Sequence, residues 1–215
     1  MHAIIDSKGD VDPFKIAEYY VAWKKTMPRD IGFATSAALD ILNYSLRSKD
    51  KFEKGIVQVK EANKASKSNG ALMRTTPLAV LCRNKSNEDI ISLTKKDVQL
   101  THGNRCVLYS VALYNIAIAH LLNNHNDAQG AIKVVDDQLK KLSESDSSTS
   151  QYEDLLINWE VVKTTDSESQ HELIQADDKI GKSYLPHVLL YSLFYRIHFD
   201  CFLVCFLLLE ARALI

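Results

Sequence analysis

The sequence predicts an all-α protein. Long stretches of the chain carry apolar residues three and four positions apart, the spacing that places them on one face of a helix. Only 7 Gly and 4 Pro occur among the 215 residues, too few for the closely spaced turns of a β-sandwich or barrel. With 46% hydrophobic and 25% charged residues, the composition is that of a globular domain. We therefore expect one domain of packed helices over residues 1–215.

Four helices are expected in the first half of the chain. The first begins at Asp12, a typical N-cap residue, with Pro13 at the first helical position, where its missing N–H does no harm. The lysine-rich segment 47–67 is interpreted as a solvated helix that leads into a polar turn. The fourth helix opens with Ser86 and Asp89, which resemble a capping box. The second helix is expected at about 34–46, and the fourth is expected to end near Gly103.

The second half of the chain holds the most apolar segments. Residues 105–122 carry so many Val, Leu and Ile residues that we expect this helix at the centre of the fold, followed by a helix over 128–142. Residues 143–150, which read SESDSSTS, cannot bury apolar area and are expected to form a flexible loop. The segment 199–215 is a divergent apolar tail, and its core at 201–209 is too short to span a bilayer.

Charge and cysteine content narrow the functional classes. The chain has 26 Lys and Arg against 27 Asp and Glu, a net charge of -1, so it gives no electrostatic case for binding nucleic acid or an anionic membrane. Its 4 cysteines form no CxxC pair, and residues 1–6 are too few for the apolar core of a secretory signal. We expect reduced thiols and an intracellular, cytoplasmic protein, with neither nucleic acid nor membrane as a partner.

Two short stretches carry the most chemistry, Ser-Asn-Gly-Ala-Leu-Met-Arg at 68–74 and Leu-Thr-His at 100–102. A Ser/Asn/Gly turn before a helix presents backbone N–H groups and small side chains, which suit a phosphate or a sugar hydroxyl. At the end of a helix, His102 would add a hydrogen-bond donor or acceptor, or stack on a ring. The alternative interpretation is that Asn69 and Gly70 only cap a helix.

These stretches resemble the nucleotide-contacting core of the ADP-ribosylglycohydrolases, the family that includes the dinitrogenase reductase-activating glycohydrolases. The specific match is Ser68–Pro77 (SNGALMRTTP), followed by Leu100-Thr101-His102. The resemblance covers most of residues 10–198. Its weaker parts are Trp23 followed by Pro28, Asp30 and Gly32, similar to a Trp then Pro-x-Asp-x-Gly connection of the family, and a later Ile180-Gly181 segment.

The resemblance implies a compact orthogonal bundle of helices around a cleft that holds ADP-ribose beside two divalent cations, usually magnesium. The family hydrolyses the bond that joins ADP-ribose to a side chain or a small acceptor. Arg74 is interpreted as a structural tie between the polar loop and the helix bundle. The implied ligand-binding residues are Ser66, Ser68, Asn69 and Gly70 at the diphosphate and ribose, and His102 at the adenosine end or the pyrophosphate.

The sequence departs from the family at its metal ligands. Members bind their cations through a Thr-Asp-Asp element near the N-terminus and an Asp-x-Asp-Thr element near the C-terminus, because hard cations need several converging carboxylates. Neither element is present, so the domain is expected to be partial, truncated at both ends. We interpret two acidic pairs as charges without a metal: Asp136-Asp137 on the surface and Asp177-Asp178 at a helix end. A zinc site could be formed by His198, Cys201 and Cys205, but we favour buried side chains for this set. No catalytic or metal-ligating residue is assigned, and magnesium is not expected to bind this chain.

Two functional hypotheses follow, and a third, less favoured one is membrane association through residues 184–215. The first is an ADP-ribosylglycohydrolase-like protein with impaired or absent hydrolytic activity, whose partner is ADP-ribose or an ADP-ribosylated protein. The alternative is a non-catalytic ADP-ribose-binding or structural module, similar to the lens crystallins that resemble this family. The apolar tail at 199–215 is expected to promote self-association where it is exposed.

Overall fold

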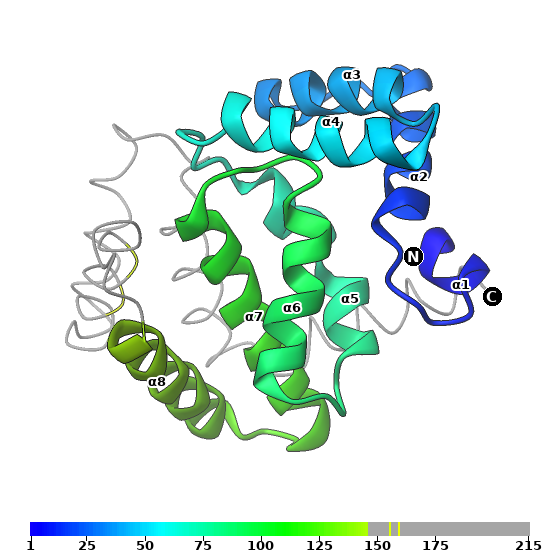
Figure 1. Cartoon of the computed structure of the whole chain (residues 1–215). Coiled ribbons are helices and arrows are strands. Elements are labelled where there is room, and N and C mark those ends of the chain that lie inside the picture. The colour runs from blue at the N-terminus through cyan, green and yellow to red at the C-terminus, as the bar shows by residue number, and fades with distance from the viewer. Residues whose placement is uncertain (146–154, 156–158, 160–215) are drawn as a thin grey trace.

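The computed structural model describes residues 1–145, 155 and 159, and the regular structure in this part of the chain is helical, with no strand. The prediction of an all-α fold is therefore confirmed. The elements in chain order are α1 (His2–Asp6), α2 (Pro13–Lys25), α3 (Phe33–Ser45), α4 (Lys49–Ala62), the 3-10 helix η1 (Asn69–Arg74), α5 (Thr76–Leu81), α6 (Asn87–Val98), α7 (Arg105–Asn123) and α8 (Ala128–Ser145) (Figure 1).

The helix starts lie where the capping residues predict them. The Asp12 carboxylate accepts a hydrogen bond of 2.9 Å from the backbone N–H of Phe14, and Pro13 occupies the first position of α2. The Ser86 hydroxyl accepts a hydrogen bond of 3.1 Å from the N–H of Asp89 at the start of α6. Both predicted starts are confirmed, because a cap depends only on neighbouring residues.

Two expected boundaries need correction, and one helix was not predicted. Helix α6 ends at Val98 instead of near Gly103, and the chain then turns through bonds from Leu100 and Thr101 to carbonyls three residues earlier. Helix α1 was not predicted, because its five residues are too few to show a helical period. Helix α8 continues to Ser145, into the expected loop, and the rest of 143–150 lies outside the described residues.

Helix α4 is more deeply packed than the interpretation as a solvated helix suggested. It buries Phe52, Gly55 and Val59, which share one face, while its lysines occupy the rest of the surface. Gly55 lies so close to α3 that an added Cβ would stand 2.3 Å from the Ser45 hydroxyl oxygen. The many lysines hide this narrow apolar stripe in the sequence.

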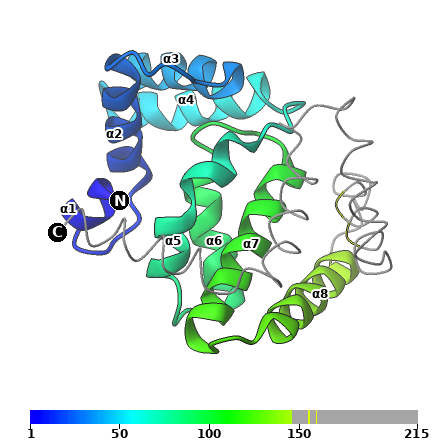
Figure 2. The ribbon, with the colours of Figure 1, turned by 180° about the vertical axis from the view of Figure 1, so that it is seen from behind.

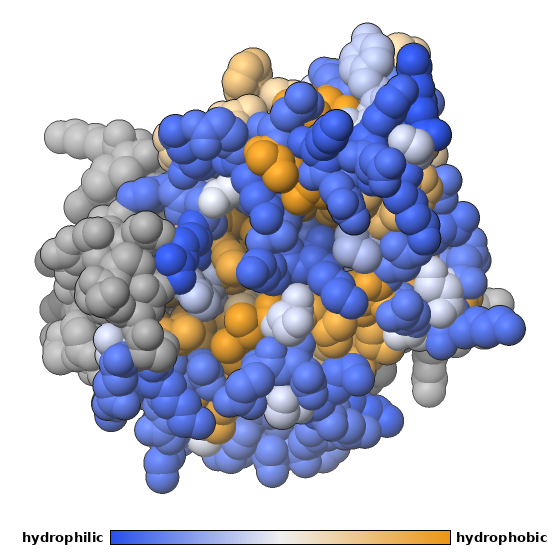
Figure 3. Space-filling model, viewed as in Figure 1, coloured by the Kyte–Doolittle hydropathy of each residue, from blue (hydrophilic) through white to orange (hydrophobic). Residues whose placement is uncertain are grey.

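Helix α7 is the centre of the fold, as predicted. It packs against α5, α6 and α8, while α3 and α4 lie side by side and run crosswise to α6 and α7 (Figures 1 and 2). Its apolar composition and length would suit a membrane span, but 67% of its most apolar 18-residue stretch is buried inside the protein. Ile116 and Ala119 of α7 belong to the core beneath α1–α4, whereas most of its other buried residues pack in the core shared with α8. The face seen in Figure 3 is largely hydrophilic, with apolar residues showing between the helices.

Candidate functional site

The polar loop at residues 66–70 is held by a buried histidine. Nε2 of His102 lies 2.9 Å from the Ser68 hydroxyl oxygen, and Nδ1 lies 2.8 Å from the hydroxyl oxygen of Thr101. The Ser66 hydroxyl lies 3.3 Å from that of Ser68. Three of the residues singled out in the sequence, Ser66, Ser68 and His102, therefore meet in space although His102 is 34 positions from Ser68.

The histidine is a neutral hydrogen-bonding group here. Its side chain is 1% exposed, and burial, followed by the nearby charge of Arg74, lowers the pKa of His102 to about 3. A serine, a histidine and a third polar group also form nucleophilic triads, but a general base must accept a proton and needs a partner that stabilises its charge. The hydroxyl of Thr101 is no such anion. The geometry thus assigns His102 to holding Ser68 and not to deprotonating it.

Gly70 is required by close approach. A Cβ at this position would stand 2.6 Å from the Thr35 hydroxyl oxygen of α3 and 3.5 Å from Cε1 of His102. The Gly70 carbonyl accepts a hydrogen bond of 3.1 Å from Nη1 of Arg74. The neighbouring Asn69 is half-buried, and its side-chain amide has no hydrogen-bond partner within the described part of the chain. The loop therefore combines fixed backbone with one available amide.

Arg74 ties the loop to the helix bundle, which confirms its structural interpretation. Its Nε lies 3.2 Å from Oδ2 of Asp97 on α6, and its Nη2 donates to the Asp97 carbonyl over 3.1 Å. The Tyr20 hydroxyl of α2 donates to Oδ1 of Asp97 over 2.6 Å, and the guanidinium lies 4.9 Å from the Tyr20 ring centre. Burial, together with the charge of Asp97, raises the pKa of Tyr20.

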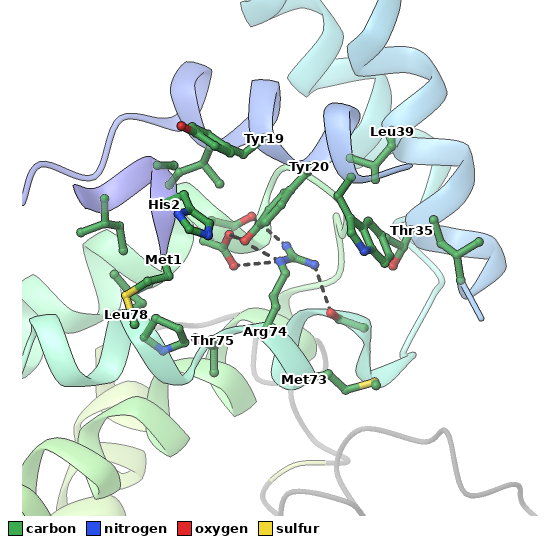
Figure 4. A pocket seen from close by; sticks show the side chains of 18 of the residues that line it. Met1, His2, Tyr19, Tyr20, Thr35, Leu39, Met73, Arg74, Thr75 and Leu78 are labelled. Carbon is green, nitrogen blue, oxygen red and sulfur yellow. Dashed lines mark hydrogen bonds and ion pairs between the residues drawn. The ribbon is translucent and has the colours of Figure 1, made fainter. Parts of the chain in front are cut away.

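A cavity of about 430 Å³ lies beside this cluster, between α1, α2 and α3 on one side and η1 and α5 on the other (Figure 4). Figure 4 shows the Arg74 guanidinium bonded to the buried carboxylate and to the loop carbonyl at the edge of the cavity. The wall is mostly apolar, with Ile16, Leu39 and Leu78 among its residues. Trp23 is 43% exposed and lines this cavity.

The structure divides the predicted ligand-binding residues into two groups. Gly70 lines the cavity, whereas Ser66, Ser68, Asn69 and His102 lie outside its lining, on the loop and behind it. Sequence reasoning missed Thr35, Tyr20 and Asp97 as parts of this site. Their only sequence signal is a position within an ordinary helical pattern, because their role depends on partners far along the chain.

Two described carboxylates line the cavity, and one of them is already paired. The two that line the cavity are Asp30 and Asp97, and both oxygens of Asp97 are already bonded to Arg74 or Tyr20. Among the residues the structure describes, no three His, Cys, Asp or Glu side chains come together as metal ligands. Asp136 pairs with Lys140 at 2.9 Å and accepts from the Trp159 indole at 3.2 Å. The sequence candidates outside the described residues are Asp177, Asp178, His198, Cys201, Cys205 and the tail at 199–215.

These features define an all-α protein with a glycine-containing polar loop anchored beside a small-molecule-sized cavity. The family model of the ADP-ribosylglycohydrolases matches residues 1–203, and the chain belongs to this family. A protein of Acanthamoeba polyphaga mimivirus, named "Putative ADP-ribosyl glycohydrolase L543", is 26% identical to this chain over 129 residues, which is 58% of the chain. The matched stretch spans 37% of the length of that relative. No solved structure matches the chain significantly.

Proposed function

We propose that this chain recognises ADP-ribose, free or attached to a protein, at residues 66–70 and in the adjoining cavity. The observation that carries the proposal is the anchoring of this loop in a member of the ADP-ribosylglycohydrolase family. His102 holds Ser68 at one end, and Arg74 holds the Gly70 carbonyl at the other. A loop fixed before its ligand arrives loses little entropy on binding.

The chemistry of the loop and the cavity suits the two halves of such a ligand. Hydroxyl groups of Ser66 and Ser68 and the amide of Asn69 offer hydrogen bonds to phosphate and ribose oxygens. The cavity offers apolar wall area and the exposed Trp23 ring, which suit a sugar or a base. Gly70 belongs to both, so one ligand could extend from the loop into the cavity.

We further propose that the described residues support recognition without efficient hydrolysis. Divalent cations of the kind that the family resemblance implies would supply Lewis-acid chemistry at the scissile bond, and converging carboxylates would have to hold them. The oxygens of Asp97 are committed to Arg74 and Tyr20, so the described carboxylates leave no converging set for such cations. We therefore assign no hydrolytic step to these described residues.

Calorimetric titration of the full chain with ADP-ribose tests the proposal, with one series in excess magnesium and one in a chelator. We expect saturable binding of similar affinity in both series. Release of ADP-ribose from arginine- and serine-modified peptides is measured in parallel, and we expect little or none. Absence of binding would contradict the recognition proposal, whereas rapid magnesium-dependent release would contradict only the proposal of inefficient hydrolysis.

A further inference from the structure

The buried hydroxyl of Thr101 contacts a ring nitrogen of His102. We propose that Thr101 is a positioning residue that acts through His102, so that the Ser68 hydroxyl donates its hydrogen outward to a ligand oxygen that can only accept. The inference rests on the proposed function for its ligand, but the position of the proton on His102 is a property of the free protein. Two contacts support it: the Thr101 hydroxyl oxygen lies 2.8 Å from Nδ1 of His102, and the Ser68 hydroxyl oxygen lies 2.9 Å from Nε2.

A neutral imidazole has one N–H donor and one acceptor nitrogen. Two arrangements therefore fit these contacts. In one, Thr101 donates to Nδ1 and Nε2–H donates to Ser68. In the other, Ser68 donates to Nε2 and Nδ1–H donates to Thr101. The heavy-atom distances are the same in both, so the choice depends on what each leaves unsatisfied.

The surroundings of Thr101 favour the first arrangement. Its side chain is 0% exposed, and Nδ1 of His102 is the single hydrogen-bond partner of its hydroxyl within the described part of the chain. If Nδ1–H donated to Thr101, the hydroxyl hydrogen would be left buried without an acceptor, an unfavourable arrangement. If Thr101 donates, only a lone pair remains unused. Nε2 then carries the proton.

This proton position determines what Ser68 offers to a ligand. The Ser68 oxygen accepts from Nε2–H, and the Ser66 hydroxyl lies within reach as a second donor. The Ser68 hydrogen is then available to donate, and Ser68 is half-buried on the loop rather than enclosed. The ionised diphosphate oxygens of ADP-ribose accept and do not donate, so they match this site, whereas an amide N–H or an ammonium group does not.

Nitrogen NMR of the free protein tests the proton position directly. With 15N-labelled histidine, the His102 signals are assigned by their loss in a His102→Gln variant among the 7 histidines. We expect the Nε2–H form across neutral pH. Predominance of the Nδ1–H form would overturn the inference whether or not any ligand binds.

Ligand affinity tests the consequence. Thr101→Val removes the hydroxyl with little change in shape, and Thr101→Ser restores it. We expect Thr101→Val to weaken ADP-ribose binding about tenfold and Thr101→Ser to recover most of the loss. Adenosine, which lacks phosphate, should bind both variants equally. Unchanged ADP-ribose affinity in a folded Thr101→Val protein, or equal losses with valine and serine, would overturn the inference. Failure of the wild-type chain to bind ADP-ribose would instead contradict the proposed function.

Discussion

Nε of Arg74 lies 3.2 Å from Oδ2 of Asp97, and this ion pair joins η1 to α6 at the edge of the cavity. Both side chains are largely buried, with 17% and 7% of their surface exposed. The same guanidinium donates to the Gly70 carbonyl. The position of the candidate loop therefore depends on a charge carried by a different helix.

Replacement of Asp97 by asparagine should destabilise the fold strongly. Asp97→Asn leaves the Arg74 charge without its partner, and breaking a buried pair from one side typically costs about 3 kcal/mol or more. The matched control is Asp40→Asn, since Asp40 pairs with Lys24 but is 64% exposed. An exposed pair contributes about 0–1 kcal/mol. Urea denaturation of both variants measures the difference, and equal effects would show that the Arg74 pair is not a special anchor.

The stability of the protein should fall as the pH drops below about 6.5, because His102 then binds a proton in the unfolded chain but stays neutral in the folded protein. The pKa of His102 is about 3 in the folded state, lowered by burial and then by Arg74. The unfolded state binds more protons between these two values, so the free energy of unfolding rises with pH across this window. Between pH 7.5 and pH 5 the expected loss is about 2 kcal/mol.

The variant His102→Gln isolates this contribution. Its free energy of unfolding should change less between the two pH values than that of the wild type, whatever its overall stability. His125→Gln is the control, because His125 is exposed, and it should keep the wild-type pH dependence. If His102→Gln kept the full dependence, another group would be responsible.

Gly103 should tolerate no side chain. A Cβ there would lie 1.9 Å from the backbone carbonyl oxygen of Lys60, which cannot move without shifting the end of α4. We expect Gly103→Ala to destabilise by about 2 kcal/mol. Gly32→Ser is the control, since a Cβ at Gly32 meets nothing within 4 Å and serine is a favoured N-cap. Thermal melts compare the two, and similar losses would contradict the close packing of Gly103.

The sequence predicted what depends on neighbouring residues and missed what depends on distant ones. The caps Asp12 and Ser86 and the apolar density of α7 were readable because each signal lies within a few residues. The family resemblance placed Ser68 and His102 at one ligand, but it did not predict the contact between them. The pairing of Arg74 with Asp97 was not predictable, because these residues are 23 positions apart and nothing local marks Asp97 as buried.

The predicted end of α6 was wrong for a related reason. The pattern of α6 continues beyond Val98 in sequence, but the chain turns there and so brings Thr101 and His102 behind the polar loop. That early end creates the site. A periodic pattern shows which residues can share a face, but it does not show where tertiary contacts stop the helix.

Recognition of ADP-ribose by this loop is tested by the ADP-ribose affinity of Ser68→Ala compared with that of Ser92→Ala. Ser68 is held on the loop by His102, whereas Ser92 lies exposed on α6 away from the cavity lining. We expect Ser68→Ala, if folded as judged by its melt, to bind ADP-ribose about tenfold or more weakly, because it loses a hydrogen bond to a charged group. Ser92→Ala should bind like the wild type. Equal affinities for the two variants would contradict recognition of ADP-ribose by this loop.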